Sequence, residues 1–121
     1  MKTRGSNTYQ NIPEFSHGKA IDDDANTRWA TDSGTKQAWL EVDLGKPTKF
    51  GRVNIEESSG RVQAFEILVK QGEEWKPVTK GTKIGEHFTA EFEPVTAQTV
   101  RLMILDASDG PTISDFQLLA K

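Results

Sequence analysis

The sequence predicts an all-β domain folded as an antiparallel β-sandwich. Apolar and polar residues alternate with a period close to two along most of the 121 residues, which is the pattern of half-buried strands. The alternating stretches recur roughly every 10–12 residues and are separated by Gly, Pro and Asp, as in antiparallel sandwiches. No window carries the apolar stripe of an amphipathic helix. A chain of this length forms one domain.

Each expected strand follows the same alternation and ends at turn-forming residues. Residues 39–44 place three aliphatic side chains on one face and two acidic ones on the other. Gly45 and Pro47 then predict a turn, and Gly72 predicts another between two later strands. The expected strands are residues 39–44, 50–56, 65–70, 75–79, 88–92, 100–104 and 113–119.

Composition sets the boundaries of the domain and excludes several classes of partner. Residues 1–8 are expected to be a flexible N-terminal segment or the edge of a longer protein, and residues 9–121 the single domain. The first residues lack the apolar stretch of a signal peptide, so none is expected in this sequence, and no apolar run approaches the roughly 20 residues of a membrane helix. The 15 Lys and Arg against 18 Asp and Glu give a net charge of −3. Neither nucleic acid nor a membrane is therefore expected as a partner. Cysteine is absent, which excludes disulfides and thiolate chemistry.

An acidic segment precedes the first expected strand. Asp22, Asp24 and Asn26 follow the one, three, five spacing of a calcium-binding loop. The helix–loop–helix form of that loop does not fit, because its glycine position is Thr27 and its bidentate glutamate position is Ser33. The spacing alone leaves two interpretations open: a solvated acidic turn, or a hard-cation site completed by oxygens from elsewhere in the chain.

The sequence does not favour an enzyme. His17 and His87 lack the spacing of a metal-binding pair, and no Gly-x-Ser-x-Gly elbow is present. Glu56 and Glu57 are adjacent, so in a strand they point to opposite faces and cannot flank one glycosidic bond. We expect no catalytic residue in this chain.

Five motifs carry a family resemblance. They are Lys-Ala-Ile-Asp-x-Asp-x-x-Thr-x-Trp at 19–29, Trp-Leu-Glu-Val-Asp-Leu-Gly at 39–45, Arg-Val-Gln-Ala-Phe-Glu-Ile at 61–67, Val-Arg-Leu at 100–102 and Thr-Ile-Ser-Asp-Phe at 112–116. In this order they resemble the discoidin or F5/8 type C family, which includes the family 32 carbohydrate-binding modules. Segments 81–85, 92–97 and 110–116 resemble, more narrowly, the C-terminal β-sandwich of family 29 α-L-fucosidases. The resemblance implies a galactose-binding-domain-like jelly roll.

The resemblance also implies a structural calcium ion, held by the loop before the first core strand and by the last strand. Carried over by position, its ligands are Lys19 and Ser114 through their backbone carbonyls, Asp22, Asp24, Thr27 and Asp115. The family commonly has Glu as the last acid, and the shorter Asp115 would hold the ion less fully. Calcium takes six to eight oxygens, at about 2.3–2.6 Å, in irregular geometry.

A sugar site is expected at one end of the sandwich, where residues 32–37, 58–61 and 107–112 would meet. The candidate ligands for sugar hydroxyls are Arg61, Lys36, Glu57 and Asp109. Arg61 is the leading one, because its planar guanidinium can donate two hydrogen bonds to adjacent hydroxyls. The alternative for Arg61 is an ordinary surface pair with Glu57. These loops contain no aromatic residue, and residues 110–112 replace the aromatic that many sugar-binding relatives carry.

The three tryptophans are expected to pack against the protein rather than bind sugar. Trp29 would lie beneath the calcium loop, Trp39 in a core strand and Trp75 at one edge of the sandwich. Tyr9 and Phe15, from the N-terminal segment, could supply the aromatic surface that the loops lack.

The resemblance implies a non-catalytic accessory module of an α-L-fucosidase-like glycoside hydrolase. It would bind a galactose- or fucose-type glycan weakly and be stabilised by calcium. The alternative is a structural domain that packs on the neighbouring catalytic domain and has no sugar site. A discoidin-type adhesion or lipid-binding module is a third interpretation, which the absence of apolar residues in the loops disfavours. The longer protein is expected to be secreted, periplasmic or at the cell surface.

Overall fold

The computed structural model describes residues 2–6, 29–32, 34–57, 61–85 and 87–119. Its strands are β1 (Lys2–Gly5), β2 (Trp29–Ala30), β3 (Ala38–Glu57), β4 (Val62–Gln71), β5 (Glu74–Gly81), β6 (Phe88–Ala107) and β7 (Thr112–Leu119). No helix occurs in these five ranges. The predicted all-β class is confirmed.

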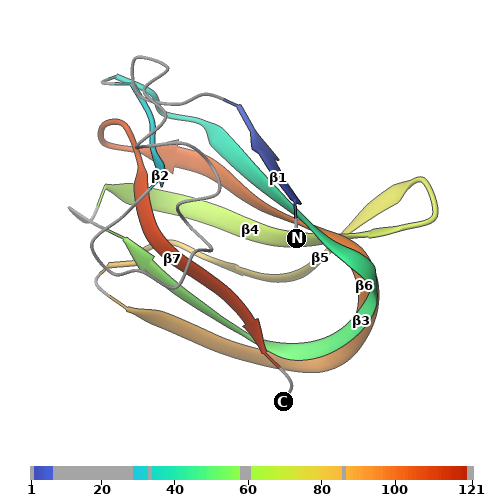
Figure 1. Cartoon of the computed structure of the whole chain (residues 1–121). Helices are drawn as coiled ribbons and strands as arrows, with labels where there is room; N and C mark the ends of the chain where they lie inside the picture. Colours follow the sequence, from blue (N-terminus) through green and yellow to red (C-terminus); the bar gives the residue numbers. More distant parts are fainter. Residues whose placement is uncertain (1, 7–28, 33, 58–60, 86, 120–121) are drawn as a thin grey trace.

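The strands form one continuous antiparallel sheet that folds over on itself. Its order is β2-β7-β3-β6-β4-β5. β1 pairs with residues 40–43 of β3, on the edge that faces away from β6. Figure 1 shows the long strands β3 and β6 bending together, which divides the sheet into two layers. We call these layers the first half-sheet (β1, residues 38–43 of β3, residues 99–104 of β6, β4 and β5) and the second half-sheet (residues 52–57 of β3, residues 88–91 of β6, β7 and β2).

The bend explains a difference from the predicted strands. The register between β3 and β6 shifts between Asp43 and Thr48, and Gly45 has a φ of 86°, a conformation that favours glycine. The sequence predicted a turn here and two separate strands. The chain instead bends and continues, because β6 follows it through the bend and its hydrogen bonds resume beyond the irregularity. The segments 88–92 and 100–104 merge into β6 in the same way.

The core lies between the two half-sheets. Alternate side chains of every long strand point into it, including Leu40, Val42, Val53, Ile55, Ile67, Val100, Leu102 and Ile104. Two aromatic pairs close it edge to face, Phe50 with Phe92 and Phe65 with Phe88, with ring centroids 5.9 and 5.0 Å apart. Trp29 is fully buried in the same core, which confirms its predicted packing role.

The N-terminal residues differ from the flexible segment expected over residues 1–8. Lys2–Gly5 form β1 and pair with β3 from Asp43 to Leu40, and the Ser6 amide donates to the Trp39 carbonyl at 3.0 Å. Four residues are too few to show an alternating pattern, so this strand could not be predicted from the sequence. The sandwich therefore includes residues 2–6.

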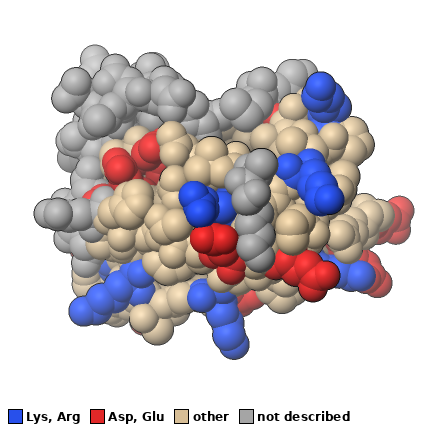
Figure 2. Space-filling model, turned by 90° about the horizontal axis from the view of Figure 1, so that it is seen from below, with Lys and Arg blue, Asp and Glu red and all other residues tan. Residues whose placement is uncertain are grey.

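Charges of both signs are mixed on the surface. Figure 2 shows Lys and Arg beside Asp and Glu on one face, without a continuous basic area of the kind that binds nucleic acid. No helix of the described ranges is long and apolar enough to cross a membrane.

Candidate functional site

Three segments distant in sequence meet at one end of the sandwich. The Gly34 amide donates to the Asp109 Oδ1 at 2.6 Å, and the Ser108 amide donates to the Arg61 carbonyl at 2.9 Å. The Lys36 Nζ lies 3.5 Å from the Ala107 carbonyl oxygen. We call this end the tip; its described residues are 31, 32, 34–37, 57, 61 and 107–111. All four predicted sugar ligands, Lys36, Glu57, Arg61 and Asp109, lie at the tip.

Glu57 ends β3 and is buried beneath the tip, with 4% of its surface exposed. Its Oε2 accepts hydrogen bonds from the Arg61 and Val62 amides at 2.8 and 2.7 Å. Its Oε1 is buried and has no hydrogen-bond partner among the described residues. Burial raises the pKa of the Glu57 carboxyl above its ordinary value of 4.5, although the two amide hydrogen bonds act in the opposite direction. Glu57 therefore fixes the start of β4 and supports the tip from below.

Arg61 connects the start of β4 to the loop between β6 and β7. Its Nη1 donates to the Gly110 carbonyl at 3.0 Å. Its contact with Glu57 is made by the backbone amide, whereas the predicted alternative was a surface pair of the two side chains. A guanidinium has five N–H donors, so one bond to Gly110 leaves donors for a ligand.

Asp109 joins the other two loops of the tip. Its Oδ1 accepts hydrogen bonds from the Gly34 amide at 2.6 Å and the Gly110 amide at 2.8 Å. These two bonds hold the pKa of Asp109 below its ordinary value of 3.8, so its carboxyl is ionised at neutral pH. The tip thus presents a fixed carboxylate beside the cations Arg61 and Lys36.

The backbone of the tip is closely packed around Gly110. The Thr31 amide and hydroxyl both donate to the Pro111 carbonyl, at 3.2 and 2.8 Å. A Cβ on Gly110 would lie 2.5 Å from the Asp32 carbonyl oxygen. The role of Thr31 was not predicted from the sequence. The close approach of Gly110 to the Asp32 carbonyl was indicated only by the Gly110-Pro111 dipeptide.

Part of the predicted calcium site can be placed. Lys19, Asp22, Asp24 and Thr27 lie outside the described residues, whereas Ser114 and Asp115 lie on β7. Trp29, the residue that follows the acidic segment, pairs with Ile113 of β7. Carbonyl and carboxylate oxygens are the ligands that calcium prefers. The Ser114 carbonyl and the Asp115 carboxylate are of this chemical type.

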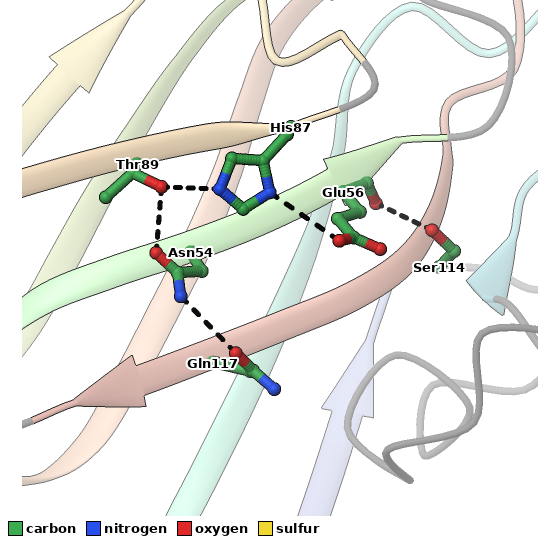
Figure 3. A network of polar contacts seen from close by, with 6 residues as sticks. All are labelled: Asn54, Glu56, His87, Thr89, Ser114 and Gln117. Carbon is green, nitrogen blue, oxygen red and sulfur yellow. Dashed lines mark hydrogen bonds and ion pairs between the residues drawn. The ribbon is translucent and has the colours of Figure 1, made fainter.

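Other potential sites are weaker. Over the ranges that the structure describes, no three His, Cys, Asp or Glu residues gather as metal ligands. Glu56 lies 38% exposed on the outer face of the second half-sheet while Glu57 is buried, so the two carboxyls do face opposite ways. His87 contacts Glu56 at 3.5 Å and the Thr89 hydroxyl at 2.7 Å (Figure 3). This arrangement contains no acid–base pair of a glycosidase.

Comparison with known families identifies the domain. The family model of the F5/8 type C domain matches residues 3–116. The chain belongs to the F5/8 type C domain family. Its two-layered sheet is the jelly-roll β-sandwich of that family.

Several proteins similar to this F5/8 type C domain are larger enzymes. The chain is 26% identical over 106 residues to "Putative alpha-L-fucosidase 1" of Oryza sativa subsp. japonica. This match covers 85% of the chain and 20% of that protein. A Ruminococcus gnavus GH29 fucosidase in complex with fucose is 27% identical with a TM-score of 0.90, covering 99% of this chain and 25% of the fucosidase. The domain thus spans about a fifth to a quarter of these relatives, and the matching part of GH29 fucosidases is their C-terminal domain.

A free-standing module has the same fold. Chitosan-binding module 2 of a Paenibacillus sp. IK-5 chitosanase/glucanase, solved with chitotriose, matches with a TM-score of 0.90 at 23% identity. The match covers 98% of this chain and 95% of that module. The F5/8 type C domain therefore has the architecture of non-catalytic carbohydrate-binding modules.

Proposed function

We propose that this F5/8 type C domain is a carbohydrate-binding accessory module of a longer α-L-fucosidase-like hydrolase, and that it binds a galactose- or fucose-type glycan at the tip. The observation that carries the proposal is the convergence of Arg61, Lys36 and Asp109 from three separate segments. The fucosidase relatives and the chitosan-binding module support it. The longer protein would be secreted, periplasmic or at the cell surface, where polysaccharides occur.

The tip residues divide into ligands and a support. Arg61 and Lys36 donate hydrogen bonds to sugar hydroxyls, and Asp109 accepts them through the oxygen that the loop bonds do not use. Glu57 positions Arg61 from below through the backbone. A shallow polar site with no aromatic ring among its described residues gives a dissociation constant on the order of millimolar.

A second candidate function is a structural domain without a sugar site. The tip side chains that favour binding also bond within the protein: Asp109 to two amides and Arg61 to the Gly110 carbonyl. In this alternative the same bonds serve only to hold the loops for contact with a neighbouring catalytic domain.

A sugar titration separates the two. With fucose, galactose or chitotriose raised to tens of millimolar, we expect saturable amide NMR shifts in residues 34–37, 61 and 107–111. Arg61→Ala should abolish these shifts. Arg52→Ala is the matched control, because Arg52 pairs with Glu91 on the exposed second half-sheet and should leave them unchanged. If no sugar shifts the tip of the unaltered domain, the structural function holds instead.

We further propose that a calcium ion, held by Asp115, the Ser114 carbonyl and the acidic segment, stabilises the domain. A ligand that binds only the folded state raises its melting temperature. Chelator should therefore lower the melting temperature by several degrees. Asp115→Ala should do the same and remove the response to calcium, whereas Asp106→Ala, an exposed aspartate on β6, should keep that response. An unchanged melt in chelator, with no metal in elemental analysis, would contradict the site.

A further inference from the structure

The two half-sheets have outer faces of different chemistry. The outer face of the second half-sheet is polar: Thr89 donates to Asn54 at 2.9 Å, and Asn54 donates to Gln117 at 3.4 Å (Figure 3). The outer face of the first half-sheet instead carries an apolar group around Arg101, made of Trp39, Leu68, Trp75 and Met103. None of these four belongs to the core. A two-layered sandwich needs no apolar side chains on an outer face for its own stability.

Arg101 holds both indoles in place. Its guanidinium carbon lies 4.3 Å from the centre of the Trp75 ring and 4.9 Å from that of Trp39. Its Nε donates to the Glu41 Oε1 at 3.0 Å, and its Nη2 contacts the same oxygen. The Glu41 side chain is 3% exposed and the Arg101 side chain 24%. The guanidinium is therefore fixed, and the Trp75 ring rests on a rigid cation that is paired with a buried carboxylate.

Trp75 lies among polar groups at the end of the β4–β5 hairpin. It is partly exposed and lies opposite Lys70, next to the turn at Gly72. The charged side chains of this hairpin are exposed and of both signs: Lys70, Glu73, Glu74 and Lys76. Lys70 pairs with Trp75 and shares its face of the sheet, whereas Glu74 and Lys76 flank Trp75 along β5 and point to the other face. An aromatic ring beside a polar side chain is the composition of a site for a small polar ligand.

This hairpin is far from the tip. Figure 1 shows it at the opposite end of the first half-sheet from the start of β4 and the end of β6, which lie beside the tip. Val62 begins β4 beside the tip and Lys70 lies eight residues along it, or about 27 Å at strand spacing. A monosaccharide at the tip cannot reach Trp75.

The surface favours a glycan over a protein partner. A stable protein interface buries about 800 Å² on each side around exposed apolar residues. Among the described residues only Leu105, at 37%, counts as an exposed large hydrophobic, and Leu68 and Met103 are partly buried. One indole face is, in contrast, sufficient for a pyranose ring, whose electropositive C–H groups suit the negative face of the indole. The pairing of Arg101 with Glu41 favours a sugar without charge.

We propose that Trp75, fixed by Arg101 and next to Lys70 on the same face, is a second carbohydrate-binding surface, for an uncharged glycan whose pyranose ring stacks on the indole. This inference keeps the ligand class of the proposed function but not its site, so each can fail without the other.

The test is an NMR titration of the whole domain with cellopentaose, to tens of millimolar. The indole N–H signal of Trp75 and the amides of residues 70–76 should shift and saturate. The indole signal of Trp29, which is fully buried, should stay unchanged and serve as an internal control. Arg61→Ala should lose the tip response to fucose and keep the hairpin response to cellopentaose.

The substitutions Trp75→Ala and Trp75→Tyr complete the test. Trp75→Ala should weaken cellopentaose binding by about tenfold or more, and Trp75→Tyr should keep part of the affinity because it retains an aromatic face. An unchanged Trp29 signal shows that each variant is folded. The proposal is overturned if cellopentaose leaves residues 70–76 unshifted, or if Trp75→Ala binds it as tightly as the unaltered domain.

Discussion

Arg101→Met is expected to destabilise the domain by about 1.5–3 kcal/mol, the range for losing a hydrogen bond to a charged group. Glu41 is 2% exposed, and Arg101 satisfies its carboxylate with two N–H groups. Without Arg101 the buried Glu41 carboxylate loses both of these charge-assisted hydrogen bonds. The two indoles also lose the cation that they contact. Urea unfolding followed by far-ultraviolet circular dichroism measures the loss.

Two controls test the cause of this effect. The double variant Arg101→Met with Glu41→Leu should recover most of the stability, because apolar residues can replace a buried ion pair at little cost. Arg52→Met removes the exposed pair with Glu91, whose side chains are 41% and 47% exposed, and should cost at most about 1 kcal/mol. If Arg101→Met cost no more than Arg52→Met, the buried pair would not be the source of stability.

Gly110→Ala is expected to cost about 1–3 kcal/mol, the range of steric overpacking, and to change the shape of the tip. The new Cβ would lie 2.5 Å from the Asp32 carbonyl oxygen and 2.9 Å from that of Thr31. Both contacts are with backbone atoms, so no side-chain rotation can relieve them. The loops at residues 31–35 and 107–111 must separate, which would also displace the carbonyl that Arg61 contacts.

Thermal melts and amide NMR spectra together measure the effect of Gly110→Ala. Gly34→Ala is the matched control: its φ is +82°, so alanine is strained there, but nothing lies within 4 Å of the added Cβ. Gly34→Ala should therefore destabilise modestly and leave the signals of residues 107–111 in place. A Gly110→Ala protein with unaltered signals at residues 31–35 would show that the close approach is not rigid.

The strand positions could be predicted because alternation is a local property of the sequence. The continuity of β3 through Gly45 could not, since it depends on pairing with β6, about 60 residues away along the chain. The same alternation also predicts the position of Trp39. Trp39 is in phase with Glu41 and Asp43, not with Leu40 and Val42, which places it on the outer face.

The site was predicted in outline and not in detail. The approach of residues 32–37 and 107–112 follows from strands that run antiparallel into the same end. The partners of individual side chains do not follow from any local pattern. Arg61 and Gly110 are 49 residues apart, and only the folded loops bring the guanidinium to that carbonyl. The burial of Glu57 similarly depends on the turn into β4.

The long strands β3 and β6 also determine when the domain can fold during synthesis. Leu40 pairs with Leu102, and Trp29 pairs with Ile113 near the C-terminal end. Until β6 and β7 emerge from the ribosome, the pairings available to the described strands are the β4–β5 hairpin and β1 with β3. The apolar faces of β3 and β4 stay uncovered during that time, and closure through such distant pairs is slow, on the order of milliseconds to seconds. The nascent chain therefore depends on rapid completion of its last third to avoid pairing with another copy.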